Sequence, residues 1–178
     1  MGLGKDANVA YIIDFGLSKE FQDHHTHQHI PLGRTHGLTR TPAFASIYSH
    51  LGFELGRHDS LESLGYVLIY LLCGSLPWQG LNFKCNDLIC KSKQMISISE
   101  LCNRLLVEPQ TFLNYSCSLS FNDKPNYEYL CSLFNDMLSQ AGVEGDFIFD
   151  WVSDGNEQQQ GFSFDGLKHG NFSKPRTR

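Results

Sequence analysis

Apolar residues are densest between Asp59 and Trp78, in the stretch DSLESLGYVLIYLLCGSLPW, which predicts the central helix of the chain. No charged side chain occurs from Leu64 to Cys73, and the unbroken apolar run from Tyr66 to Leu72 covers every face of a helix. A helix that is apolar all round must be buried on all sides. A bilayer span needs about 20 apolar residues, so this shorter run predicts a core helix.

The two ends of the central helix carry recognisable signals. Asp59 can cap the first N–H groups, and Glu62 three residues later completes a capping-box pattern. Gly74 stands where a left-handed residue ends a helix, and Pro77 prevents continuation. These signals predict a helix over Asp59–Cys73, which the other elements must cover.

The remaining pattern predicts one strand and several short helices. Val9–Asp14 (VAYIID) has the composition of a short buried β strand. Phe121–Pro125 predicts a turn, and the alternating Phe147, Phe149 and Trp151 predict an apolar anchor for the end of the fold. The polar, Gly-rich residues 153–178 predict disorder. Helices are expected near Asp87–Lys93, Ser99–Leu106, Pro109–Leu119 and Tyr127–Leu138.

Leu17–His58 is polar and weakly periodic, and a connection of this length is usually functional or mobile. His25, His27 and His29 could share one face of a strand and, with His24, bind a metal. No Cys or carboxylate cluster completes a metal shell beside them, so a polar loop is the preferred interpretation. A zinc site built on Cys85 and Cys90 is likewise disfavoured, because no C-x-x-C pair or matching His spacing accompanies it.

Composition narrows the functional class. The 178 residues are 41% hydrophobic and 19% charged, which is typical of one globular domain. A net charge of −5 with scattered basic residues gives no nucleic-acid surface. The N-terminus has no apolar signal core, so we expect an intracellular protein, cytoplasmic or nuclear, with no membrane partner. The six cysteines are then expected to be reduced.

Asp14-Phe15-Gly16 follows the predicted strand. Gly16 permits a turn that a β-carbon would hinder, and an Asp at the end of a buried strand could hold a hard cation such as Mg²⁺. Three residues alone are more often a simple turn than a cation site.

Five ordered pieces of the chain resemble the casein kinase I family of Ser/Thr protein kinases. They are YIIDFGLSKEF, THQHIP, SHLGFE, LESLGYVLIY with GSLPWQGL, and DKPNYEYL. The resemblance covers about residues 1–151 and implies a mainly α fold. This fold would be a protein-kinase-like C-terminal lobe around a buried central helix, with a short β strand before an activation segment of about residues 14–46. The implied domain is 1–152, followed by a disordered tail at 153–178.

The resemblance also implies roles for single residues. Asp14 corresponds to the carboxylate that holds Mg²⁺ against the ATP phosphates, and Gly16 to the glycine of the same motif. Thr41 corresponds to an activation-segment threonine that contacts the catalytic loop. ATP and Mg²⁺ are the implied cofactors, and protein Ser/Thr side chains the implied substrates.

Other kinase parts are missing from these 178 residues. The Gly-rich loop, the strand lysine and the H-R-D catalytic loop with its Asn are all absent from the sequence. Phosphoryl transfer depends on positioning and electrostatic stabilisation by these groups, and Asp14 by itself cannot replace them. We therefore expect this chain alone to be inactive as a kinase and not to bind ATP.

The matched region also departs from the family pattern. Where the family has T-G-T-A-R-Y-A-S, residues 39–46 are TRTPAFAS, so Arg40 replaces a glycine and Ala43 replaces a phosphate-binding arginine. A second basic residue of that anion pocket aligns near Ile89. The chain then lacks the donors that would bind a phosphate group on a substrate and so select that substrate. Ser60 replaces an Asp that braces the catalytic loop.

Two hypotheses remain open. In the first, the chain is a truncated casein kinase I-like protein whose full form phosphorylates proteins. In the second, it is a non-catalytic, pseudokinase-type module that binds a protein partner. Without an N-terminal lobe, one face of the central helix and the edge of Val9–Asp14 would be exposed. About 300 Å² of wet apolar surface would forgo roughly 7 kcal/mol, so we expect aggregation or a need for a partner.

Overall fold

The computed structural model describes residues 9–35, 41–81, 86–103 and 105–142, together with Gly2 and Asp6. This described part is mainly helical, which confirms the predicted class, and its only β pairing consists of two isolated bridges. None of its helices is long and apolar enough to cross a membrane. The elements are η2 (Phe15–Leu17), α1 (Ile47–His50), α2 (Arg57–Cys73), α3 (Asn86–Met95), α4 (Ile98–Leu101), α5 (Val107–Ser118) and α6 (Tyr127–Gln140).

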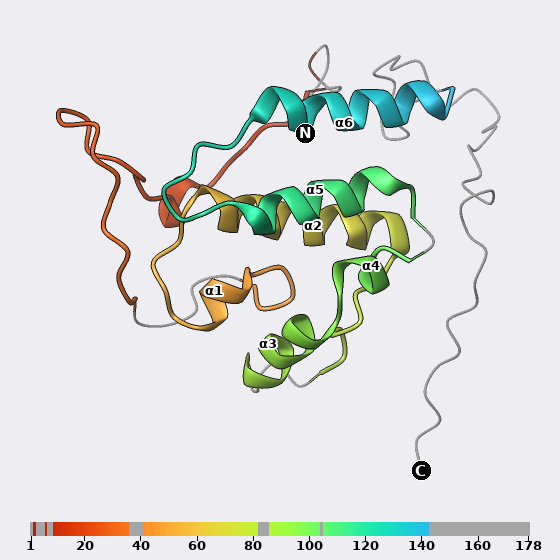
Figure 1. Ribbon diagram of the computed structural model, residues 1–178, viewed down its shortest axis with the longest axis horizontal. Helices are drawn as coiled ribbons and strands as arrows, with labels where there is room; N and C mark the ends of the chain where they lie inside the picture. The colour runs from red at the N-terminus through yellow and green to blue at the C-terminus, as the bar shows by residue number, and fades with distance from the viewer. Residues whose placement is uncertain are drawn as a thin grey trace.

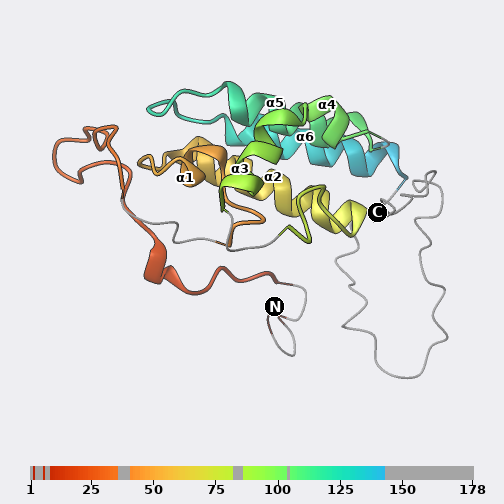
Figure 2. The same cartoon turned by 90° about the horizontal axis from the view of Figure 1, so that it is seen from below.

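The helices pack side by side around α2 and α5 (Figures 1 and 2). α5 lies along α2 and also contacts α6, while α1 packs on α3. Gly65 lets α2 and α5 approach closely, because a β-carbon there would run into the side chain of Leu113. One buried cluster joins α2, α3 and α5 through Tyr66, Ile69, Leu76, Trp78, Ile89, Cys102 and Leu113, and a second joins α2, α5 and α6 through Leu61, Phe112 and Leu130.

The start of α2 differs from the prediction. The helix begins at Arg57, and its N-cap is Gly56 rather than Asp59. Asp59 lies inside the first turn and accepts a hydrogen bond of 2.7 Å from the Gly56 N–H. Glu62 is not part of the cap, because its carboxylate is used in a tertiary contact. The predicted end is correct: Gly74 has a left-handed backbone (φ 74°), and its N–H bonds Tyr70 O at 2.7 Å.

The expectation that α2 is buried on all sides was wrong. Leu64 is 44% exposed and Leu71 is 70% exposed. Both residues lie on the side of α2 opposite the face that carries Gly65 and Ile69, which packs on α5 and the core. The apolar run therefore reflects a helix that leaves one apolar stripe in water.

The predicted strand is also wrong. Val9–Asp14 has no strand assignment and no strand pairing within the described residues, and Ile12 and Ile13 are 84% and 79% exposed. β propensity mostly measures packing against neighbouring strands, so the segment cannot form a ladder without one. Figure 2 shows this part of the chain running apart from the helices.

The other helices agree with the pattern to within a few residues. α3, α5 and α6 match the predicted helices, and Phe121–Pro125 forms the predicted connection. α4 begins at Ile98, because Ser97 is its cap and accepts from the Glu100 N–H, and it ends at Leu101, so the predicted helix to Leu106 was too long by five residues. The one-turn helix α1 was not predicted. The aromatic anchor around Phe147 and the tail at 153–178 lie outside the described residues.

Replacing Gly65 by Ala should destabilise the fold by about 1–3 kcal/mol, because overpacking against Leu113 outweighs the gain in helix propensity. Urea unfolding followed by circular dichroism would measure this change. Gly33→Ala is the matched control, since a β-carbon there meets nothing within 4 Å. An unchanged midpoint for Gly65→Ala would contradict the close approach of α2 and α5.

The exposed segment around Ile12 and Ile13 should make the isolated chain self-associate, because a wet apolar patch is an aggregation site. Ile12→Lys with Ile13→Lys should raise the monomer fraction measured by light scattering after size-exclusion chromatography. Gln28→Lys adds charge at an exposed polar position and should not change that fraction. A wild-type chain that is monomeric and melts cooperatively would count against this prediction.

Candidate functional site

The Asp14-Phe15-Gly16 turn is an exposed, strained loop. Asp14 has a left-handed backbone (φ 63°, ψ 75°), and its Oδ1 accepts the Gly16 N–H at 3.2 Å. A non-glycine residue in this region costs on the order of 1–3 kcal/mol, and such strain clusters at functional sites. The strain gives Asp14 a physical reason to be a candidate beyond its three-residue motif.

Thr41, the second candidate, lies at the start of a different segment. Its carbonyl accepts the N–H groups of Phe44 and Ala45 at 3.0 and 3.1 Å, which makes a tight turn. Its side chain is exposed, and no hydrogen bond within the described residues joins it to Asp14 or Gly16. The structure therefore does not bring the predicted site residues together.

Residues 41–49, which we call the docked segment, place several small side chains in the protein interior: Ala43, Ala45, Ser46 and Ser49 are buried, whereas Thr41 and Tyr48 are exposed. The indole N–H of Trp78 donates to Ala43 O at 2.8 Å. The ammonium of Lys93 donates to Pro42 O at 3.0 Å and to Ala45 O at 2.5 Å. Side chains from later parts of the chain thus satisfy three carbonyls of this segment, those of Pro42, Ala43 and Ala45.

Two carboxylates of α2 hold the other half of the docked segment. Asp59, which is fully buried, accepts the Ser46 hydroxyl at 2.7 Å. Glu62 accepts the Ile47 N–H at 3.0 Å and the Tyr66 hydroxyl at 2.7 Å. Burial raises the pKa of Glu62, and its two hydrogen-bond donors oppose that rise.

Lys93 is the most unusual side chain of the site. It is only 4% exposed, and its ammonium lies 4.7 Å from the ring centre of Tyr66 and 5.1 Å from that of Trp78. Within the described residues no carboxylate forms an ion pair with it. Burial lowers the pKa of Lys93 to about 8, while the Glu62 carboxylate acts in the opposite direction.

His50 completes this cluster from the last turn of α1. Its Nε2 lies 3.1 Å from Pro42 O and 3.3 Å from the Lys93 ammonium. Burial, followed by the Lys93 charge, lowers the pKa of His50, and the Pro42 carbonyl opposes that change. His50 is therefore held in its neutral form.

The histidine-rich stretch forms a small loop closed by a bridge between Gln22 and His29. The Asp23 carboxylate accepts the N–H and hydroxyl of Thr26 and the N–H of His25, and these bonds lower the pKa of Asp23. His27 has a positive φ of 56°, which breaks the alternation expected of a strand. In the described residues, no three His, Cys, Asp or Glu side chains are grouped as metal ligands. Cys85 lies outside those residues, and Cys90 is buried in α3.

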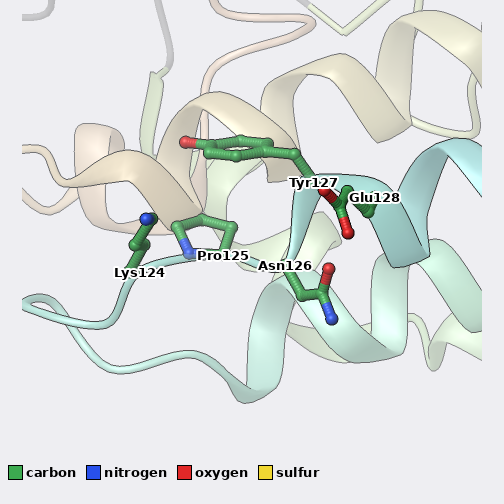
Figure 3. A pocket seen from close by; sticks show the side chains of 5 residues that line it. All are labelled: Lys124, Pro125, Asn126, Tyr127 and Glu128. Atoms are coloured by element: carbon green, nitrogen blue, oxygen red, sulfur yellow. The ribbon is translucent and has the colours of Figure 1, made fainter.

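A hollow of about 460 Å³ lies at the turn into α6. Five consecutive residues, Lys124 to Glu128, line it, and Figure 3 shows their side chains around the first turn of α6. It contains no predicted site residue. A hollow built from a single turn provides no convergent set of catalytic groups.

The two positions where the resemblance implies basic, phosphate-binding residues are apolar and buried. Ala43 is 7% exposed, and Ile89 has no exposed surface. Neither position can receive an anion from solvent. Ala43 is part of the docked segment, and Ile89 belongs to the buried cluster that joins α2, α3 and α5.

Sequence analysis missed the buried polar groups, above all Lys93 and Glu62. A signal for Lys93 was present, because it shares one face of α3 with Ile89 and Cys90, at spacings of four and three residues. A lysine on an apolar helical face indicates either a buried partner or a snorkelling side chain. No known family model matches this chain.

The effect of Lys93 on stability should depend on pH. Its pKa falls from 10.5 to about 8 on folding, so between these values the unfolded chain holds one more proton, and stability rises with pH. The free energy of unfolding of the wild type, minus that of Lys93→Met, should rise by about 3 kcal/mol across this window.

Denaturant melts at several pH values would measure this difference. The raised thiol pKa values of Cys102 and Cys117 act in the opposite direction, but equally in both proteins. A difference that stays flat from pH 8 to 10.5 would show that Lys93 keeps its ordinary pKa.

Proposed function

We propose that this chain is a casein kinase I-like lobe: part of a Ser/Thr kinase domain that does not transfer phosphate by itself. The observation that carries the proposal is the way its motifs converge. Glu62 comes from LESLGYVLIY and Trp78 from GSLPWQGL, and both bind the main chain of the docked segment. Residues that carry the resemblance thus hold the end of the implied activation segment.

This anchoring suits a segment that positions a protein substrate. Its main chain is bonded to Glu62, Trp78 and Lys93, and its Ser46 hydroxyl to Asp59, and all four of these partners are buried. A surface supported by satisfied, buried groups keeps its shape when a second molecule binds. Positioning of this kind supplies much of the catalysis of phosphoryl transfer.

Asp14, which is not linked to the docked segment by any described hydrogen bond, supports the same proposal. Its Oδ1 is bonded to the Gly16 N–H, and no described residue donates to its Oδ2. Mg²⁺ is usually held by one or two carboxylates together with substrate phosphates, so this single carboxylate fits that chemistry. Asp14 would hold the ion once a nucleotide site is completed, and the ion would neutralise charge on the phosphates.

The second candidate is a non-catalytic module that binds a protein partner. The exposed apolar side chains before and after Asp14 favour it, since Ile13 is 79% exposed and Phe15 is 67% exposed. Such side chains commonly mark an interaction surface. In this case the strained turn would serve recognition rather than catalysis.

Calorimetric titration of the purified chain with Mg-ATP should give no Asp14-dependent heat, because one carboxylate cannot replace the missing phosphate-binding groups. Asp14→Asn tests the dependence, and Asp136→Asn, an exposed carboxylate on α6, is the matched control. Binding that only Asp14→Asn abolishes would contradict the expectation that the lone chain does not bind ATP, and an assay for phosphate transfer would then follow.

A second experiment supplies the kinase parts that these 178 residues lack and tests whether activity appears. The chain is co-expressed with the N-terminal part of a casein kinase I enzyme, ending after its catalytic loop. A complex should form and phosphorylate casein, and Asp14→Asn should lower the rate by at least about 100-fold. Failure to form a complex would leave the partner-binding module as the better hypothesis.

A further inference from the structure

We propose that His50 and Lys93 form an acid-sensitive latch, which holds the docked segment at neutral pH and releases it when His50 gains a proton. The inference stands on the contacts of the docked segment and does not depend on the kinase assignment. The latch joins the last turn of α1 to the last turn of α3, because His50 and Lys93 both contact the Pro42 carbonyl.

The contacts of the His50 ring make it the weakest point of the latch. Its Nε2 faces both a donor, Lys93 Nζ at 3.3 Å, and an acceptor, Pro42 O at 3.1 Å. If Nε2 is unprotonated it accepts from Lys93, but then the proton on the buried Nδ1 has no partner within the described residues. If Nε2 carries the proton, it points toward the Lys93 donor. Each neutral form leaves one group unsatisfied.

A second proton makes this arrangement worse. The imidazolium cannot accept from Lys93, and two positive charges would then lie 3.3 Å apart, one of them on the buried Lys93 side chain and the other on the partly buried His50. Lys93 would keep its bonds to Pro42 and Ala45 only against that repulsion. Moving His50 into solvent removes the conflict, and α1 carries the docked segment with it.

Other titratable groups around the latch act in the same direction or weakly. Glu62 faces Lys93 from α2 with Asp59 beside it, and Cys90 is the nearest thiol on α3. Because burial raises the pKa of Glu62, its carboxylate loses charge early as the pH falls, and its support of the Lys93 cation weakens. The Tyr66 hydroxyl stays protonated, since burial raises its pKa.

The sign of the effect follows from proton linkage. In the closed state burial and Lys93 lower the pKa of His50, whereas release returns it towards 6.5. The released state therefore binds the proton more tightly, and its population rises as the pH falls below 6.5.

Trp78 reports the state of the latch, because its indole N–H is bonded to Ala43 O and the side chain is 1% exposed. The chain has two tryptophans, so Trp151→Phe leaves Trp78 as the single tryptophan, which can be excited apart from the tyrosines. Acrylamide quenching of this variant should rise at least about twofold from about pH 7.5 to about pH 5, while helical circular dichroism persists.

Two further variants decide the proposal. In the Trp151→Phe background, His50→Gln should abolish the pH dependence, and His24→Gln, an exposed histidine of the loop, should not. Lys93→Gln removes the facing charge whose repulsion drives release but keeps an amide donor, so the rise in quenching between about pH 7.5 and about pH 5 should shrink. Quenching that does not change with pH, or that keeps its pH dependence in His50→Gln, would overturn the latch. If His50→Gln does not fold, a pH-dependent rise in quenching that is unchanged in Lys93→Gln would do the same.

Discussion

The interior of this protein is organised by a stretch of buried main chain that has little regular secondary structure. Ala45 and Ser46 are almost completely buried. Local main-chain hydrogen bonds in this stretch are limited to the turn at Thr41 and to the start of α1. Each unsatisfied buried group would cost about 1–3 kcal/mol. The polar side chains in the core are therefore a consequence of where the docked segment lies.

This constraint explains why charged residues occur at positions that look apolar. Lys93 and Glu62 face the core between Tyr66 and Trp78, where a hydrocarbon side chain would pack well. Replacing a buried charged group by a hydrophobic one is often neutral or stabilising when its partners also change. Here the partners include main-chain atoms of the docked segment, which a side-chain substitution leaves in place, so the polar groups specify one position for the segment.

The difference between local patterns and contacts between distant residues separates what the sequence could predict from what it could not. α3, α5, α6 and the end of α2 at Gly74 depend on periodicity and local backbone preference, and these features are visible along the chain. Val9–Asp14 needed a neighbouring strand, and Glu62 could serve a cap or a distant N–H equally well. Their outcomes depend on contacts between residues far apart in sequence, which pattern alone does not contain. Lys93 was detectable only as an exception to the apolar face of α3.

The two parts of the candidate site therefore differ in physical state. The docked segment is internally satisfied, whereas the Asp14 turn is strained and surrounded by exposed apolar side chains. Two unit charges 4 Å apart interact by about 1 kcal/mol in water and by about 4 kcal/mol near a protein surface. Asp14 gains electrostatic strength only when water is excluded around it. Covering Ile13 and Phe15 would exclude that water, so any surface that relieves their exposure would also strengthen the carboxylate.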